Sequence, residues 1–372
     1  MRQLIGTARR AGLPDREAYT ALVRRTIETL RGEDPLYRPR DEQDRPGGLL
    51  RLDGRPTIIV PDLHARPWFL LQILAYRPGD GTTVFELLHR GKLQMVCVGD
   101  GFHSESRGAE RWKRAFKEFS GKYRRHSAMD EEMRESLGLM EIVMRLKIMH
   151  PDSFHFLKGN HENIQNEEGR GNHPFRKFAF EGEMVKEWVL KFYGGEFLSD
   201  FAEMEHEFPL LAADETFMVS HAEPARYYTR EEVIRYREYD DVVLGLTWTP
   251  NDGAEEGSVG RMIYEYCSSP GGARYFGGHR PVKGKYTLRA DDKYVQLHNP
   301  GTYSVALLEP GVPPDPERDI LVIPHDEDAV ERAAEAAETA LNGAESRAAA
   351  SNAEASNAAA SSAAAGAKKK EE

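Results

Sequence analysis

The stretch FHFLKGNHEN, at positions 154–163, joins a short apolar run to a cluster of polar side chains. The run Phe154–Leu157 has the composition of a strand, and Gly159 allows the backbone to turn sharply after it. Asn160 and His161 follow at once. Because Gly-Asn is ordinary turn chemistry, the stretch alone favours a simple strand end. The alternative is a tight turn that directs both polar side chains into a site.

The same arrangement recurs along the chain. Five short apolar runs are each followed within a few residues by side chains able to bind a metal ion: Asp62 and His64 after TIIV, Asp100 and His103 after MVCV, Asn160 and His161 after FHFLK, His221 after FMVS, and His279 after RYF. Layered α/β folds assemble their sites in the loops beyond strand ends. Five such strand ends in series predict one shared site.

The residue types define the chemistry of this predicted site. Carboxylate, amide and imidazole ligands without thiolates suit Mn, Fe or Zn ions. Asp100 has two carboxylate oxygens and can bridge two ions, which together bind a phosphoryl group and lower the pKa of a shared water. His161 stands beside the ligand Asn160 and is a candidate general acid that protonates the departing oxygen.

The pattern between about residues 55 and 310 predicts the fold class. Its first half alternates apolar strand-like runs with helical segments, and its second half consists of short strands joined by tight turns. This order predicts an α/β fold with two packed mixed β-sheets flanked by helices. We expect an N-terminal helix and irregular connector over residues 1–54, the main domain over 55–325, and a disordered low-complexity tail over 326–372. Ala and Glu can support a helix as far as Leu341, but beyond Asn342 the tail cannot bury enough surface to offset the cost of ordering.

Composition argues against several classes of protein. The formal net charge of −11 argues against a general nucleic-acid binder. Two cysteines, Cys97 and Cys267, provide neither a disulfide framework nor a thiolate zinc site. The most apolar run, Trp68–Tyr76, is far shorter than the roughly twenty residues of a membrane span, and no signal-peptide core is visible. We therefore expect a cytoplasmic protein without a membrane partner.

The ordered blocks resemble those of the calcineurin-like metallophosphoesterase superfamily, and most closely its phosphoprotein (Ser/Thr) phosphatase branch. The matching blocks are PDLH (61–64), GDGFH (99–103), GNHE (159–162), HAE (221–223) and GGH (277–279). The stretch LTWTPND, at 246–252, also resembles the branch's Leu-Trp-Ser-Asp-Pro. The likeness covers roughly residues 55–310 and implies a metallophosphoesterase-like β-sandwich that hydrolyses phosphate esters.

The resemblance implies a role for each matching residue. It implies two divalent or trivalent metal ions, with Asp62, His64 and Asp100 as ligands of the first and Asp100, Asn160, His221 and His279 as ligands of the second. Asp100 would then bridge the pair. His161 takes the role of general acid, and Glu162 fixes the loop by hydrogen bonding.

The second block departs from the family pattern. His103 stands where the family has an aspartate that orients the catalytic histidine, and Ser104 stands where it has a phosphate-binding arginine. Glu105 is the candidate source of the missing negative charge. Arg66 and Arg107 are near enough in sequence to replace the missing guanidinium, which binds phosphate through two parallel hydrogen bonds. Each has the alternative of being an ordinary surface arginine.

A basic insertion lies between the second and third blocks. Residues 104–130 carry arginines and lysines interleaved with aromatic residues. One interpretation is an amphipathic helix with its aromatic side buried, and the other is a cap that attracts an anionic substrate. Elsewhere, His155, His206 and His298 lack a partner motif, and the sequence favours a structural role for each.

Three functions fit these features. The leading one is a binuclear-metal phosphomonoesterase, like a protein Ser/Thr phosphatase, that hydrolyses a phosphorylated protein or similar phosphate ester by metal-activated hydroxide. The second is a nucleotide or dinucleoside-polyphosphate hydrolase, favoured if the insertion binds several phosphates. The third is a weakly active metal-binding scaffold. His103 and Ser104 support the scaffold, whereas the complete ligand set argues against it.

Overall fold

Two mixed β-sheets form the centre of the molecule. A computed structural model of the chain describes residues 1–337. The strands are β1 (Leu49–Arg51), β2 (Thr57–Val60), β3 (Gln94–Cys97), β4 (Phe154–Phe156), β5 (Leu211–Ala213), β6 (Phe217–Ser220), β7 (Arg274–Gly277), β8 (Thr287–Arg289), β9 (Tyr294–Gln296), β10 (Ser304–Leu308) and β11 (Ile320–Val322). One sheet has the order β1-β5-β6-β7-β9-β8, and the other has the order β11-β10-β2-β3-β4.

Helices connect and flank these strands. They are α1 (Arg2–Ala8), α2 (Arg16–Arg31), α3 (Pro67–Ala75), α4 (Val84–His89), η1 (Glu105–Gly108), α5 (Ala109–Ser120), α6 (Ser127–Met149), α7 (Glu181–Phe192), α8 (Gly195–Glu207), α9 (Arg230–Ile234), η2 (Tyr236–Glu238), α10 (Asp240–Thr247), α11 (Ser258–Tyr266) and α12 (Pro316–Asp319). Within residues 1–337, no helix is both long and apolar enough to cross a membrane.

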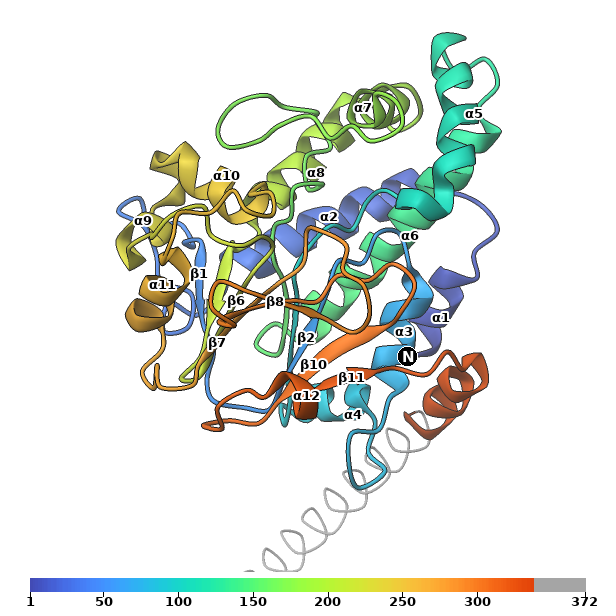
Figure 1. Cartoon of the computed structure of the whole chain (residues 1–372). Coiled ribbons are helices and arrows are strands. Elements are labelled where there is room, and N and C mark those ends of the chain that lie inside the picture. Colours follow the sequence, from blue (N-terminus) through green and yellow to red (C-terminus); the bar gives the residue numbers. More distant parts are fainter. Residues whose placement is uncertain (338–372) are drawn as a thin grey trace, which may run out of the picture.

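The two sheets pack face to face, with helices on both outer sides. Side chains point alternately to the two faces of a strand. In β2, Ile59 therefore joins the layer between the sheets, whereas Ile58 and Val60 join the core beneath the helices. This explains why the run TIIV is apolar throughout. Helices α9 and α11 lie at the left of Figure 1 and α1, α3 and α6 at the right, with the strands between them. The predicted α/β fold with two packed mixed sheets flanked by helices is confirmed.

The strand directions decide where a site can form. In one sheet β2, β3 and β4 run parallel, and in the other β6, β7 and β9 run parallel. Parallel strands end at the same edge of a sheet, so the loops that follow them converge. Six loops therefore meet at one edge of the packed sheets.

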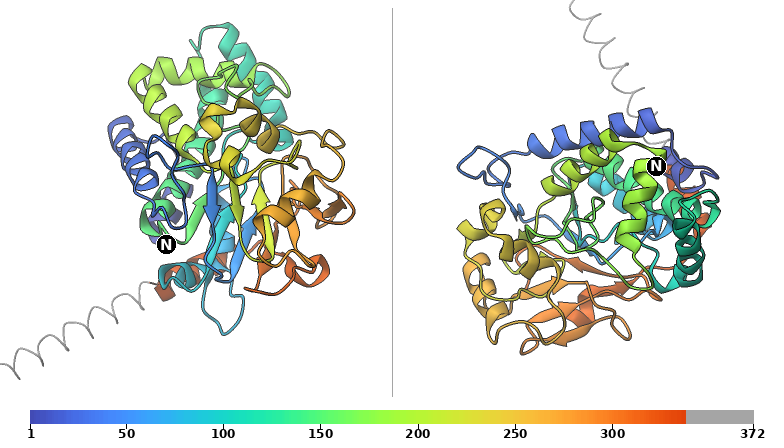
Figure 2. Two further views of the ribbon diagram at one scale, coloured as in Figure 1. Left: turned by 90° about the vertical axis from the view of Figure 1, so that its left-hand side faces the viewer. Right: turned by 90° about the horizontal axis from the view of Figure 1, so that it is seen from above.

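The N-terminal segment is integrated into this body. Helix α2 begins after Asp15, whose side chain accepts a hydrogen bond from the Ala18 amide, and it packs against α6 and α8 (Figure 2). A helix was expected within this N-terminal segment. The connector that follows leads into β1, which pairs with β5 at the edge of the six-stranded sheet.

The segment expected to be a disordered tail is helical where the structure describes it. Residues 327–337 form a helix in which Val330, Ala333 and Ala334 are buried against the core. Glu331 of this helix pairs with Arg9. The expectation of disorder from residue 326 therefore does not hold over 327–337, and residues 338–372 lie outside the described part.

Candidate metal centre

Eight polar side chains gather where the six parallel strands end. In strand order they are Asp62 and His64 after β2, Asp100 after β3, Asn160 and His161 after β4, His221 after β6, His279 after β7, and His298 after β9. All are buried or nearly so. The structure brings together every metal ligand and the general acid expected from the sequence, and it adds His298.

One pocket of this centre is formed by Asn160, His221 and His279. The Oδ1 atom of Asn160 lies 2.9 Å from both Nε2 of His221 and Nδ1 of His279, and the two nitrogens are 3.2 Å apart. Oδ1 of Asp100 lies 3.6 Å from Nε2 of His221. Atoms bound to one ion at about 2.1 Å in octahedral geometry lie about 3 Å apart. These four side chains therefore fit a metal ion.

A second pocket lies on the other side of Asp100. Nε2 of His64 is 3.6 Å from Oδ2 of Asp100 and 3.9 Å from Oδ1 of Asp62. Asp100 thus turns one carboxylate oxygen toward His64 and the other toward His221. This arrangement fits two ions that share one carboxylate.

Two backbone carbonyls set the tautomers of the histidines. Nδ1 of His64 lies 3.3 Å from the Phe102 carbonyl, and Nδ1 of His221 lies 3.0 Å from the Val98 carbonyl. Because a carbonyl oxygen accepts hydrogen bonds, the proton of each of these two histidines belongs on Nδ1. The lone pair of Nε2 then points into the centre. Burial lowers the pKa of His64 to about 3 and also lowers that of His221, so both rings are neutral, as metal ligands must be.

The buried carboxylates carry more negative charge than the protein side chains around them neutralise. Burial raises the pKa of Asp100, and the carboxylates of Glu162 and Asp62 raise it further. Burial also opposes ionisation of Asp62, and the lowering of its pKa depends mainly on positive charge on the neighbouring imidazoles, which the neutral rings of His64 and His221 do not carry. A cation next to both aspartates would remove this conflict.

Glu162 fastens two of the converging loops together. Its carboxylate accepts hydrogen bonds from the backbone amides of Gly159 at 2.6 Å, Gly101 at 2.8 Å and Asp100 at 2.9 Å. The loops after β3 and β4 are therefore held in one position relative to each other. This is the hydrogen-bonding role that the resemblance implied for Glu162.

The backbone is strained at this centre. His64, Asp100, His103, Glu105 and His279 all have positive φ angles, between 42° and 76°. Each such residue costs roughly 1–3 kcal/mol, and strain of this kind persists mainly at functional sites. Non-glycine residues outside the centre, such as Asp252 and Asp291, also have positive φ angles, so the functional role of the strand ends rests on their side-chain geometry.

Comparison with solved structures identifies the fold. A protein serine/threonine phosphatase from Saccharomyces cerevisiae superimposes with a TM-score of 0.52 at 14% identity, over 87% of this chain and 95% of that one. The chain has the metallophosphoesterase fold. A cold-active protein-tyrosine phosphatase from a psychrophilic Shewanella superimposes with a TM-score of 0.41 at 13% identity, over 74% of this chain and 82% of that one. No protein-family model matches the sequence, and no curated protein matches it.

In this metallophosphoesterase fold, His161 stands at the rim of the metal centre. Its side chain is 13% exposed, and Nε2 lies 3.8 Å from Oδ2 of Asp100. Its ring packs on Phe175 with centroids 4.6 Å apart, and Nδ1 has no hydrogen-bond partner among the described residues. Burial lowers the pKa of His161 well below its usual value, and the adjacent His103 lowers it further.

His103 lies behind His161 and is itself tightly held. Their ring centroids are 5.2 Å apart, and the other face of His103 stacks on Trp112 of α5 at 4.8 Å. Nδ1 of His103 accepts a hydrogen bond from the Glu105 amide at 3.0 Å. Glu181, rather than the side chain of Glu105, places a carboxylate near its Nε2, at 3.7 Å.

The structure places the two predicted phosphate-binding arginines on backbone carbonyls. Arg66 donates to the carbonyls of Leu63, Asp62 and Pro300. Arg107 donates to the Ala65 carbonyl and to Glu135. Arg66 thus holds the loop that carries Asp62 and His64.

The basic insertion packs as a helical hairpin. In α5, Trp112 and Ala115 are buried, and Arg111 pairs with Glu131, Glu132 and Glu135 of α6. Ser104 donates a hydrogen bond to Glu132 at 2.6 Å. The Arg111 guanidinium and the Ser104 hydroxyl therefore both bind acidic side chains of α6.

The sequence argument gave His298 only a structural role, did not single out Arg280, and placed Glu105 beside the wrong partner. His298 follows β9 by two positions, so the strand-end rule applied to the other five strands would have found it. Arg280 follows His279 directly. Glu105 was expected beside His103, but its carboxylate lies between His64, His298 and Lys177. No sequence signal connects Glu105 with His64, His298 and Lys177.

Proposed function

We propose that this protein is a metal-dependent phosphomonoesterase that uses two metal ions and acts on a phosphorylated protein or a similarly bulky phosphate ester. The observation that supports this most is the position of Asp100, with one oxygen toward His64 and the other toward His221. Because the donors are oxygens and imidazoles, Mn, Fe or Zn are the expected ions. When bound, such ions would polarise the phosphoryl group and lower the pKa of a water.

In this proposal His161 supplies the proton for the leaving oxygen, and the negative charge of a bound phosphate raises the pKa of His161, which burial lowers in the empty site. It stands at the partly exposed rim, next to the pocket that contains Asp100 and His64. Phe175 covers one face of its ring and limits the access of water. A substrate bound across both pockets would bring its leaving group to this rim.

We assign phosphate binding to Arg280. Its side chain is exposed, and within residues 1–337 its guanidinium makes no hydrogen bond or ion pair. The positive charge of Arg280 acts on a side chain of the centre. Burial and His221 lower the pKa of His279 to about 2, and Arg280 lowers it further. Its neighbours thus leave Arg280 available to bind an anion, unlike Arg66 and Arg107.

A cavity next to the centre supports a bulky substrate. It has a volume of about 600 Å³ and is lined by His173, Tyr228, Leu244 and Trp248, among others. Trp248 connects it to the metal centre, because its ring centroid lies 6.4 Å from that of His279. An aromatic-lined cavity of this size can accept the non-reacting part of a phosphate ester.

Metal-dependent hydrolysis of p-nitrophenyl phosphate tests the proposal. The purified protein is stripped with chelator and assayed with and without Mn²⁺, beside Asp100→Asn and the exposed-loop control Asp80→Asn. We expect Mn²⁺ to restore activity to the wild type and the control but not to Asp100→Asn. Full activity after complete removal of metal, or in Asp100→Asn, would refute the proposal.

A further inference from the structure

We propose that His298 is a metal ligand of the pocket formed by Asp62, His64 and Asp100, and that Glu105 orients its ring. This inference rests on the proposed two-metal function and adds two residues to it. Neither residue belongs to the ligand set that the resemblance implied.

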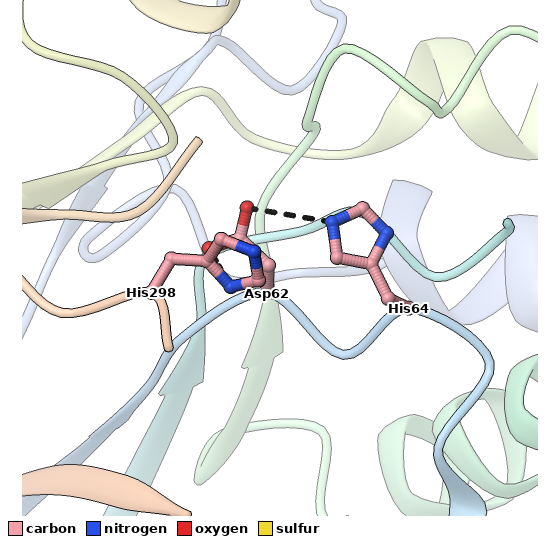
Figure 3. Close-up of side chains that lie close together, drawn as sticks. All are labelled: Asp62, His64 and His298. Atoms are coloured by element: carbon pink, nitrogen blue, oxygen red, sulfur yellow. Dashed lines mark ion pairs between the residues drawn. The ribbon is translucent and has the colours of Figure 1, made fainter. Parts of the chain in front are cut away.

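The first observation is a pair of buried atoms that face each other without a hydrogen bond. His298 and Asp62 are both 0% exposed. Figure 3 shows the rings of both His298 and His64 next to the Asp62 carboxylate. Nδ1 of His298 lies 3.5 Å from Oδ2 of Asp62. Neither atom has a hydrogen-bond partner among the described residues. A buried polar atom is normally paired, so a missing partner is indicated here.

The second observation is the contact at the other nitrogen of the ring. Nε2 of His298 lies 3.1 Å from Oε2 of Glu105. Since a carboxylate accepts, the proton of the neutral ring belongs on Nε2, and the Nδ1 lone pair then points at the Asp62 oxygen. Two acceptors face each other, and a cation between them resolves the conflict. Metal-binding histidines usually donate their second N–H to a carboxylate in this way.

Glu105 is itself held in place for this role. Lys177 donates a hydrogen bond to its Oε1 at 2.5 Å, and Nε2 of His64 lies 3.6 Å from the same oxygen. A carboxylate held by Lys177 therefore stands beside His298.

The competing explanation is an ordinary buried ion pair. A doubly protonated His298 would donate to Asp62 through Nδ1 and to Glu105 through Nε2, and no metal would be needed. In that case His298 would contribute to folding but not to metal binding. The two explanations differ in the metal content of variants, which can be measured without any assay of activity.

The test is equilibrium metal binding to the full chain. Apo protein is titrated with Co²⁺ and with Mn²⁺, bound metal is counted by mass spectrometry, and the visible Co²⁺ spectrum is recorded. The variants are His298→Ala, His298→Asn, His298→Gln and Glu105→Gln. The control is His206→Asn, which removes a half-exposed histidine that contacts Glu167 outside the centre. Circular dichroism of each apo protein checks folding.

We expect wild type and His206→Asn to bind two ions per chain, and His298→Ala to retain only one at the same free metal concentration. Asn places its amide near the position of Nδ1 and Gln near that of Nε2, so Asn should recover part of the affinity and Gln should not. Glu105→Gln should weaken one of the two sites by about 10–100-fold.

Two results separate the possible failures. If the wild type binds two ions and His298→Ala, His298→Asn and Glu105→Gln all bind two with unchanged affinity and spectrum, the ligand role of His298 is refuted and the ion pair is correct. If the wild type itself binds no metal, the proposed function fails as well. If His298→Ala does not fold, His298→Asn and Glu105→Gln still decide between the two explanations.

Discussion

Nε2 of His103 lies 3.7 Å from Oε1 of Glu181, although His103 stands in the loop after β3 and Glu181 begins α7. Because Nδ1 of His103 accepts a backbone amide, its proton belongs on Nε2, toward this carboxylate. The resemblance of the sequence blocks places His103 where an aspartate would orient the catalytic histidine. The His103–Glu181 pair therefore places a negative charge behind His161, but one side chain further from His161 than an aspartate at position 103 would place it.

We expect Glu181→Gln to weaken proton transfer by His161. The loss should be roughly tenfold or more in kcat for phenyl phosphate, whose leaving group needs a proton, and clearly smaller for p-nitrophenyl phosphate. Glu181 also accepts hydrogen bonds from the backbone amides of Phe178 and Ala179, so the substitution disturbs the loop before α7 as well. A purely structural role would lower kcat equally for both substrates, and that outcome would contradict the prediction.

Removal of metal should destabilise the wild type. Ions that bind only the folded state at 100 times their dissociation constant add about 2.7 kcal/mol of stability. We therefore expect Mn²⁺ to raise Tm by roughly 5 °C or more over the chelator-treated protein. Scanning calorimetry or fluorimetry with and without chelator gives the measurement.

The same experiment on Asp100→Asn has a different expected result. In the apo protein, the Asp100 carboxylate is buried near Asp62 and Glu162. Its replacement removes a repelled charge, so apo Asp100→Asn should be at least as stable as the apo wild type. Mn²⁺ should then change its Tm little. A Mn²⁺ shift as large as that of the wild type would show that Asp100 is not a ligand.

Arg280→Ala should reduce affinity for the phosphate group more than it reduces turnover. A lost charge-assisted hydrogen bond costs roughly 1.5–3 kcal/mol, so we expect KM for p-nitrophenyl phosphate and the inhibition constant of inorganic phosphate to rise about tenfold or more. Lys283→Ala is the matched control, because it removes an exposed cation from the same loop. Equal effects of the two substitutions would indicate a general charge effect only.

The sequence predicts a site at the carboxyl ends of parallel strands because the positions of its residues follow local rules. A parallel strand delivers the residues after its carboxyl end to one edge, and each of PDLH, GDGFH, GNHE, HAE and GGH follows such a strand. The apolar runs and their order also predicted two packed sheets. Both inferences need only the order of residues along a segment.

Contacts between loops could not be predicted in this way. His298 and Glu105 are 193 positions apart, and only the packing of the two sheets brings them to 3.1 Å. Glu105 and Lys177 meet because the loop before α7 crosses the centre. Residues 327–337 were assigned to a disordered tail although their alanine and glutamate content allows a helix, and only the structure shows that Ala333 of this helix packs against the core.

A buried charge network outside the centre provides a prediction for stability. Glu33, after α2, accepts hydrogen bonds from Arg38 at 2.5 Å and from Lys147 of α6, and all three are buried. Burial opposes ionisation of Glu33, yet Lys147 and Arg38 lower its pKa to about 2. A carboxyl with a lowered pKa stabilises the protein above the pKa of the unfolded state, and this contribution is lost as the pH falls toward 2.

Glu33→Gln leaves Lys147 and Arg38 without their carboxylate, and we expect it to lower the free energy of unfolding by about 3–5 kcal/mol near neutral pH. The difference from the wild type should shrink as the pH falls from about 5 to about 2, because Glu33 of the unfolded wild type binds a proton in this range while the folded protein keeps the charge until its lower pKa is reached. Urea unfolding at several pH values measures both effects. Glu28→Gln, on the exposed face of α2, should change neither. A difference from the wild type that does not depend on pH would show that the loss comes from packing rather than from charge.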